Sequence, residues 1–153
     1  MVARDSIERE ILIEAPIDVV WAVVTQPEHV SGWFSERAEI DLRPGGAAVL
    51  HWSDHGTVHG RVERVEPPHL FSFRWVVRAG PEVAEDNATL VEFRLDAQGD
   101  ATRLTVTESG FQALGGDDAA RDEIFDGHEG GWATELGHLQ DYLERRAPSP
   151  RGR

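Results

Sequence analysis

Between residues 36 and 109 the sequence alternates apolar and polar side chains in short runs, separated by clusters of glycine, proline and aspartate. An alternation with a period of two places every second side chain on one face of a β-strand. Such runs joined by tight turns predict a meander of antiparallel strands. We expect these strands at residues 36–42, 47–53, 57–66, 70–77, 89–95 and 103–108.

Another strand and two short helices are expected before the meander. Residues 6–14 alternate in the same way and place their isoleucines on one face. Residues 16–25 and 27–34 each begin with a proline that is followed closely by an acidic residue, which is the pattern of a helix N-terminus. The chain is therefore expected to build one sheet of six to seven strands, all antiparallel.

After the strands, residues 121–146 repeat apolar side chains at steps of three and four, which predicts one long amphipathic helix. The pair Gly130-Gly131 lies inside this segment and costs about 1–2 kcal/mol in helix propensity. We therefore expect either a kink there or a close approach of the helix backbone to the sheet. Residues 148–153 are expected to form a short disordered tail after a single domain at residues 1–147. The apolar face of the helix would carry Ile124, His128, Trp132, Leu136, Leu139 and Leu143.

Composition excludes several classes of function. The 153 residues contain no cysteine, which removes disulfides, thiolate nucleophiles and cysteine-ligated metals. Lys plus Arg total 15 against 28 Asp plus Glu, a formal charge of −13 at pH 7, and this acidity opposes binding to nucleic acid or to anionic membranes. No apolar run has the length of a signal peptide or a membrane span. We expect a cytoplasmic protein whose partner is neither nucleic acid nor a membrane.

Motifs for nucleotide binding or serine hydrolysis are missing from the sequence. The pair Gly45-Gly46 is followed by no lysine, and none of the patterns G-x-x-x-x-G-K-[ST], G-x-G-x-x-G and G-x-S-x-G occurs. His51, His55 and His59 surround a predicted hairpin turn, where the outer two would lie opposite each other and share a zinc or nickel ion. A metal site usually needs a third ligand and supporting partners, and a solvated turn is the simpler interpretation. We assign no metal and no cofactor.

One pair of residues stands out as a candidate for chemistry, a carboxylate and an imidazole. Glu108 shares the inward parity of Leu104 and Val106, and His128 lies on the apolar face of the predicted helix. In an apolar pocket the two groups would influence each other's protonation, and they could serve as an acid-base pair or hold a ligand hydroxyl or carbonyl. The alternatives are that they only satisfy each other, or that Glu108 caps the loop at Gly110.

Aromatic side chains supply the candidates for a pocket wall. Five tryptophans and six phenylalanines offer large flat apolar surfaces, which build a core or line a pocket. The sequence does not decide whether Trp52 faces inward. Either Leu50 and Trp52 or Val49 and His51 could occupy the inner face of this strand. Any of the candidates could belong to a solid core instead. The aromatic residues at predicted inward positions near the open end of the sheet are Trp33, Trp52, Trp75, Phe93, Phe111 and Trp132.

Short motifs in a fixed order, from Ile7 to Leu143, carry a resemblance to a known family. They are Ala15-Pro16 with Val20-Trp21, Pro27-Glu28-His29 with Trp33-Phe34, Arg43-Pro44-Gly45-Gly46, Val65-Glu66-Pro67-Pro68, Thr102-Arg103-Leu104, Glu108-Ser109-Gly110-Phe111 and Gly131-Trp132. In this order and spacing the chain resembles the START-like superfamily, also called the SRPBCC or polyketide cyclase and lipid-transport superfamily. Within it, the motifs look most like the branch of activator of heat-shock protein 90 ATPase homologue-like domains.

The resemblance implies an α+β helix-grip fold of the Bet v 1-like type, in which a curved antiparallel sheet wraps around a long C-terminal helix. It also implies a cavity between the sheet and that helix, and it implies no shared catalytic set. Some relatives in antibiotic-producing bacteria act in self-resistance to natural products, which points a little toward a natural-product ligand.

The leading hypothesis is a non-enzymatic protein that binds a small apolar or aromatic molecule in an internal cavity, for sequestration, sensing or transport. Glu108 and His128 would supply its polar contacts. One alternative is an enzyme of the cyclase or hydratase kind that uses the same pair for proton transfer. Another is a chaperone-associated protein that acts through its surface, for which an exposed apolar patch would be the sign. A homodimer is left open.

Overall fold

The computed structural model describes residues 5–54, 56–78 and 82–146. The predicted tail at residues 148–153 lies outside the described residues, and so does His55 at the centre of the predicted turn. Residues 80–81, at the start of a loop expected before the strand at residue 89, also lie outside them.

The described residues form seven strands, three α-helices and one short 3₁₀-helix. The strands are β1 (Ser6–Ile13), β2 (Arg37–Ile40), β3 (Ala47–Trp52), β4 (Gly56–Glu66), β5 (Leu70–Val76), β6 (Ala88–Gln98) and β7 (Ala101–Ser109). The helices are α1 (Ile17–Thr25), α2 (Pro27–Trp33), η1 (Phe111–Ala113) and α3 (Asp118–Arg146). Every strand and helix expected from the sequence is present, with bounds that differ by a few residues.

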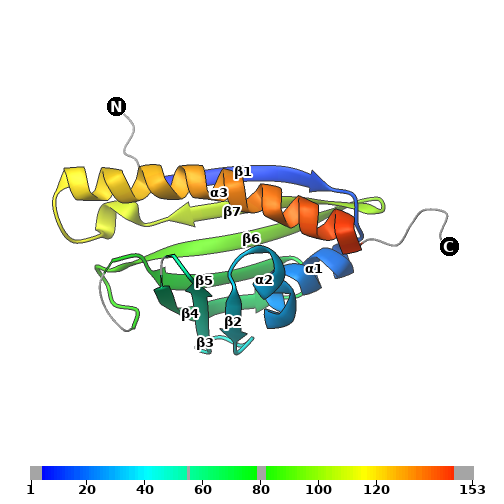
Figure 1. The fold of residues 1–153 in the computed structure, drawn as a ribbon, viewed down its shortest axis with the longest axis horizontal. Helices are drawn as coiled ribbons and strands as arrows, with labels where there is room; N and C mark the ends of the chain where they lie inside the picture. The colour runs from blue at the N-terminus through cyan, green and yellow to red at the C-terminus, as the bar shows by residue number, and fades with distance from the viewer. Residues whose placement is uncertain (1–4, 55, 79–81, 147–153) are drawn as a thin grey trace.

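All seven strands lie in one antiparallel sheet with the order β1-β7-β6-β5-β4-β3-β2. Strands β2 to β7 follow one another as a meander, and β1 pairs with the free edge of β7, where Ile7 lies opposite Glu108. The sheet curves, and α3 runs along it beside β1 and β7 (Figure 1). This is the α+β helix-grip arrangement expected from the sequence.

The alternation of the strands decides which side chains enter the core. On β5, Phe71, Phe73 and Trp75 face inward and are buried, whereas Leu12 on the outer face of β1 keeps 49% exposure. Phe93 of β6 packs against Phe71 and Phe73. Each large apolar side chain that is fully buried contributes about 1.5–3 kcal/mol, so one continuous core holds the sheet and the helices together.

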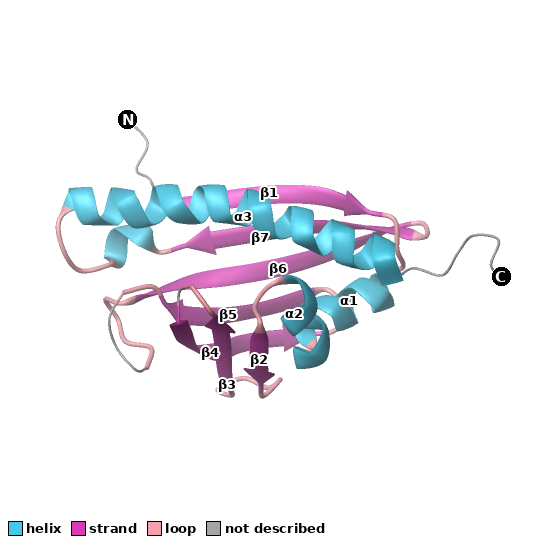
Figure 2. Cartoon of the chain, in the orientation of Figure 1, coloured by secondary structure: helices cyan, strands magenta, loops and turns pink. Residues whose placement is uncertain are grey.

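The terminal helix packs mainly against one side of the sheet. It contacts β1, η1 and α2, and near its C-terminal end the hydroxyl of Tyr142 lies 2.8 Å from Nδ1 of His29 in α2. Figure 2 shows α1 and α2 near this end of α3. Although α3 has 29 residues, neither it nor another helix of the described residues is long and apolar enough to cross a membrane.

The helix α3 begins at Asp118, three residues before the start predicted at residue 121. Asp117 explains the difference, because its carboxylate accepts the backbone N–H of Ala120 at 2.8 Å and its carbonyl accepts that of Arg121. Aspartate in this role is a favourable helix N-cap. Apolar periodicity carries no information about such a cap, and it therefore placed the start too late.

The glycines Gly130 and Gly131 do not bring α3 close to the sheet. A Cβ atom at either position would meet no heavy atom within 4 Å, and the helix is continuous from Asp118 to Arg146. The predicted close approach is therefore wrong. Both glycines lie where α3 faces open space.

The hairpin of β3 and β4 has a different register from the predicted one. Gly56 lies opposite Trp52, so His51 lies opposite Thr57 and His59 lies opposite Val49. Nδ1 of His51 contacts the Thr57 hydroxyl at 3.0 Å. The predicted pairing of the two histidines across the hairpin is wrong, because the strand register is centred at residue 54 and not at residue 55. The described residues contain no group of three or more His, Cys, Asp or Glu that could hold a metal ion.

Candidate functional site

A cleft with a volume of about 470 Å³ lies between the middle of α3 and the strands β3, β4 and β5. Its aromatic wall is formed by Phe34, Trp52, Trp75 and Trp132. Pockets for small molecules usually measure about 300–1,000 Å³ and are mostly apolar, with a few polar groups. The size and lining of the cleft therefore suit a small organic molecule.

The aromatic wall is one packed cluster. Phe34 stacks on Trp132, with ring centres 5.5 Å apart and planes at 15°, and on Trp75 at 5.7 Å and 20°. Trp52 meets the edge of Phe34 at 5.2 Å, and its indole N–H donates to the Phe34 carbonyl at 2.7 Å. Rings that are already held by their neighbours lose little further freedom when a ligand binds, which lowers the entropic cost of binding.

On the helix side, two glycines line the cleft together with the side chains of His128, Trp132 and Glu135. Gly127 and Gly131 are four residues apart, so they lie on the same face of α3, and both line the cleft. A Cβ atom at either position would meet no heavy atom within 4 Å. A larger side chain at these positions would therefore project into free space, and the two glycines keep that space open.

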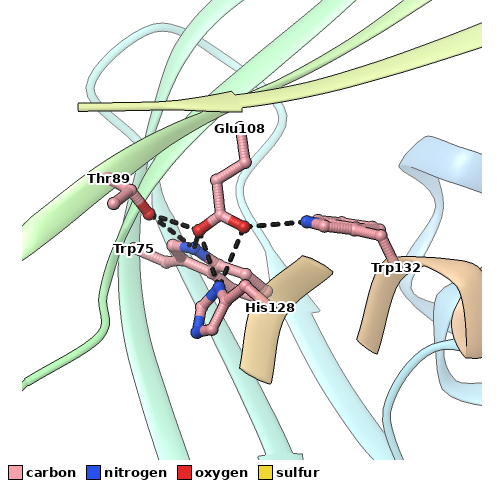
Figure 3. A network of polar contacts seen from close by, with 5 residues as sticks. All are labelled: Trp75, Thr89, Glu108, His128 and Trp132. Atoms are coloured by element: carbon pink, nitrogen blue, oxygen red, sulfur yellow. Dashed lines mark hydrogen bonds and ion pairs between the residues drawn. The ribbon is translucent and has the colours of Figure 1, made fainter. Parts of the chain in front are cut away.

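Behind the wall, Glu108 of β7 is fully buried and receives hydrogen bonds from four side chains (Figure 3). Its Oε1 accepts the indole N–H of Trp132 at 2.8 Å. Its Oε2 accepts the hydroxyl of Thr89 at 2.5 Å and the indole N–H of Trp75 at 3.0 Å. Nδ1 of His128 lies 2.9 Å from both oxygens. Since Trp75, His128 and Trp132 also line the cleft, one carboxylate fixes much of its inner wall.

Sheet register and helix spacing bring these donors together. Trp75, Thr89 and Glu108 face the same side of the adjacent strands β5, β6 and β7, and Thr89 lies directly opposite Trp75. The Thr89 hydroxyl also accepts the Trp75 indole N–H at 3.1 Å. His128 and Trp132 are four residues apart on α3, so they reach the carboxylate from one helix face.

The protonation of Glu108 depends on two opposing effects. Burial raises the pKa of Glu108, because the charged carboxylate loses its hydration. The hydrogen bond and the charge of His128 lower it, as do the hydrogen bonds from Thr89 and Trp132, and the lowering effects are the stronger. The pKa of Glu108 therefore lies below its ordinary value, and the carboxylate is ionised at neutral pH.

His128 links this carboxylate to the cleft. Its side chain keeps 26% exposure, and Figure 3 shows its second ring nitrogen pointing away from Glu108. Because an ionised carboxylate can only accept, Nδ1 carries the hydrogen of this contact. Nε2 is then an acceptor when the ring is neutral and a donor when it is charged. No side chain or backbone group of the described residues forms a hydrogen bond with Nε2.

Half of the predicted site residues line the cleft. Trp52, Trp75, His128 and Trp132 do so, and Trp52, whose parity was open, faces inward against Phe34. The predicted contact of Glu108 with His128 is also present, although Glu108 lies behind the wall and not in it.

Trp33, Phe93 and Phe111 lie in the core and do not line the cleft. Trp33 donates its indole N–H to the Val23 carbonyl at 3.0 Å and packs edge-on against Phe93. Phe111 packs edge-on against His128 at 5.8 Å. The alternation along a strand identifies which residues face inward. The distance between α3 and that strand then decides whether an inward residue lies in the packed core or lines the cleft. Contact of these three residues with a ligand stays a prediction.

Sequence reasoning missed Phe34, Arg78, Gly127 and Gly131 as lining residues. The spacing of the two glycines, four apart and beside His128, was an available signal for one open helix face. Phe34 directly follows Trp33, and the choice between the two depends on how α2 ends. Arg78 follows the last strand residue of β5 by two positions, and no pattern marks it.

Comparisons with known proteins place the chain in a wider context. The sequence profile of a family described as Activator of Hsp90 ATPase homolog 1-like protein matches residues 14–144. The structure is similar to that of DynU16, a protein in the dynemicin biosynthetic locus, with 28% identity, a TM-score of 0.72 and coverage of 92% of this chain and 47% of that chain. CalU16 from Micromonospora echinospora has 27% identity, a TM-score of 0.68 and coverage of 95% and 77%. The Aha1 dimer from Colwellia psychrerythraea has 19% identity, a TM-score of 0.73 and coverage of 94% and 97%.

These similarities carry different weights. The chain spans about half the length of DynU16, and the likeness to the Colwellia protein shows the fold alone. No curated protein matches the sequence. The function must therefore be argued from the site.

Proposed function

This chain belongs to the family of activator of Hsp90 ATPase homolog 1-like proteins, and within that family we propose that it binds a small, flat aromatic molecule in the cleft beside α3. The observation that carries the proposal is the preorganised aromatic cluster of the cleft, to which the sheet contributes Trp52 and Trp75 and α3 contributes Trp132, with two glycines of α3 also in the lining. Such binding would serve the sequestration, sensing or transport of the molecule.

The flat shape of the ligand follows from the aromatic rings of the cleft. The rings of Phe34, Trp75 and Trp132 lie within 28° of one another. On α3, Gly127 and Gly131 carry no side chain and leave space at the cleft. A planar molecule can lie against the rings, and each aromatic contact adds about 0.5–1.5 kcal/mol beyond simple burial.

His128 would orient the bound molecule. Glu108 holds Nδ1 of the imidazole through both carboxylate oxygens, so the ring cannot rotate without losing these contacts. Nε2 would then meet a hydroxyl or carbonyl oxygen of the ligand. A few fixed polar groups in a mostly apolar pocket give a ligand orientation and specificity, and His128 is one of those in the lining.

The test is thermal denaturation with uncharged polycyclic aromatics, namely 2-naphthol, 9,10-anthraquinone and flavone, with decanamide as the aliphatic control. A ligand at about 100 times its Kd stabilises the folded state by about 2.7 kcal/mol. For a domain of this size we expect Tm to rise by roughly 5–10 °C. Decanamide should give a smaller rise.

Two matched variants locate the binding. Gly131→Leu fills the cleft from the helix side, whereas Gly130→Leu adds the same side chain at an exposed position that does not line the cleft. The aromatic compounds should raise Tm of Gly130→Leu and leave Tm of Gly131→Leu unchanged. The proposal fails if no aromatic compound raises Tm of the wild-type protein, or if Gly131→Leu keeps the full rise.

The same histidine favours a second candidate, an enzyme of the cyclase or hydratase kind. A neutral imidazole backed by an ionised carboxylate is a general base, and Nε2 of His128 has no partner among the described residues. The test is deuterium exchange, followed by NMR, at the acidic carbon of 1-(2-naphthyl)butane-1,3-dione. Exchange faster than in buffer, and lost in His128→Gln, would favour the enzyme, whereas no acceleration leaves binding alone.

A chaperone-associated role through the surface has less support. The large apolar side chains that the described residues expose are Leu12, Val19 and Leu42, on β1, on α1 and after β2. Single exposed apolar residues are ordinary on soluble proteins and do not mark an interface.

A further inference from the structure

Arg78 lies at the cleft, two residues after the end of β5. Its guanidinium packs against Gly116 in the loop before α3, where a Cβ atom would come within 2.3 Å of Nη1. Gly116 also has a φ of 96°, a backbone conformation that favours glycine. The loop contacts the guanidinium at this glycine, while Asp118 at the start of α3 pairs with Arg121 instead.

Arg78 is unpaired in an environment where arginines are usually paired. The chain has 28 acidic residues against 15 basic ones, and on the neighbouring strands Arg61, Arg64 and Arg74 all contact glutamates. Within the described part of the chain, Arg78 forms no ion pair and no hydrogen bond. A cation left unpaired among so many acids is available to an anion from outside the protein.

The lining of the cleft is also poor in acidic groups. Glu135 is the one acidic residue among the described residues that line it, and its Oε1 lies 3.1 Å from Nδ1 of His138. His59 and His128 line the same cleft and can donate hydrogen bonds. Glu108 is fully buried behind the wall and does not itself line the cleft. With both histidines neutral, the charges of Arg78 and Glu135 cancel, so the lining has a formal charge of zero in a chain with a net charge of −13.

We propose that the cleft selects aromatic molecules that carry an acidic oxygen group such as a carboxylate, and that Arg78 binds this group. The inference rests on the proposed function, because it names the class of ligand for the same cleft. The ring system of the ligand lies on the aromatic wall, and its carboxylate accepts two parallel N–H bonds from the planar guanidinium, the geometry that arginine offers and lysine does not.

The experiment uses isothermal titration of the full chain with 2-naphthoate and with 2-naphthamide, which share a ring system and differ in charge. Because Arg78 is exposed and exposed ion pairs are weak, we expect 2-naphthoate to bind roughly two- to fivefold more tightly than 2-naphthamide. Added salt should weaken the binding of 2-naphthoate and leave that of 2-naphthamide unchanged.

Two charge-matched variants separate the site from the net charge. Arg78→Gln should remove the preference for 2-naphthoate over 2-naphthamide. Arg94→Gln removes the same charge from the exposed face of β6 and should preserve the preference. Arg78→Lys, which keeps the charge without the planar fork, should restore only part of it.

The possible failures are distinguishable. Equal affinity for the two probes, or a preference that survives Arg78→Gln, overturns the inference and leaves the proposed function intact. A preference that Arg94→Gln also removes overturns it as well, because the effect would then come from net charge. If neither probe binds and the uncharged aromatics also leave Tm unchanged, both the inference and the proposed function are wrong.

Discussion

Nδ1 of His128 lies 2.9 Å from both carboxylate oxygens of Glu108, and this contact joins the buried interior of the sheet to the cleft. The same carboxylate accepts the indole N–H groups of Trp75 and Trp132, which form part of the cleft wall. One buried residue therefore contributes to the stability of the fold and to the shape of the site. Substitution of Glu108 should therefore affect both the stability of the fold and the shape of the site. Substitution of one of its hydrogen-bond partners can affect one of these properties without the other.

Glu108→Gln should lower the free energy of unfolding by about 2–4 kcal/mol. The amide has one acceptor in place of two, and its NH₂ group would face side chains that are themselves donors, so buried N–H groups lose their partners. Urea denaturation followed by circular dichroism measures the loss. Glu8→Gln, on the exposed face of β1, is the control and should change stability by less than about 0.5 kcal/mol. Equal stability of the two variants would mean that the network contributes nothing.

The stability of the wild-type protein should fall in acid more steeply than that of Glu108→Gln. Burial raises the pKa of Glu108, but His128, Thr89 and Trp132 lower it by more, so the folded-state pKa lies below the ordinary value of 4.5. The folded protein then binds this proton less readily than the unfolded chain does. The stabilisation is fully present above the ordinary value and is lost as pH falls through the lower folded-state pKa.

Urea midpoints measured between about pH 7 and about pH 3 check this sign. The difference between wild type and Glu108→Gln should be constant near neutral pH and should shrink in acid. If burial dominated, the folded-state pKa would be raised, the folded protein would bind the proton more readily than the unfolded chain, and the difference would grow as pH falls. A difference that grows in acid would contradict the assignment of an ionised, hydrogen-bonded Glu108.

The contact between Glu108 and His128 shows what the sequence can predict. The inward parity of β7 and the apolar periodicity of α3 were enough to place both side chains in the interior, because each pattern is local and has a fixed geometric period. The same local patterns predicted every strand and every α-helix of the described residues, but not the 3₁₀-helix η1. The turn after β3 and the cap at Asp117 were less predictable, since they depend on single hydrogen bonds.

The limits of the cleft could not be predicted in the same way. Trp33 and Trp132 are both inward-facing tryptophans, yet only Trp132 lines the cleft. The difference arises because α3 packs mainly on β1, η1 and α2, and this packing leaves space on the side of β3 to β5. It is a relationship between distant elements, and no local pattern of residues encodes it.

These two tryptophans make a matched pair. Trp132→Phe removes the indole N–H that Glu108 accepts, and Trp33→Phe removes one that the Val23 carbonyl accepts. Each variant should lose about 1–2 kcal/mol of stability, because each leaves a buried acceptor with one bond fewer. Only Trp132→Phe should also weaken the binding of 2-naphthol, measured by titration calorimetry. Equal weakening by both variants would show that the core as a whole, and not the cleft wall, determines affinity.

Three glycine substitutions should change stability in opposite directions. Gly130→Ala and Gly131→Ala should each raise the free energy of unfolding by about 0.5–1 kcal/mol, because alanine is the better helix former and a Cβ atom meets no heavy atom at either position. Gly116→Ala should lower it, because its φ of 96° is a backbone conformation that L side chains rarely adopt. Of the two stabilising variants, only Gly131→Ala should weaken 2-naphthol binding, since Gly131 lines the cleft and Gly130 does not. Thermal denaturation with and without 2-naphthol measures both effects. Loss of stability in Gly131→Ala would mean that α3 approaches its surroundings more closely at this point than the open cleft allows.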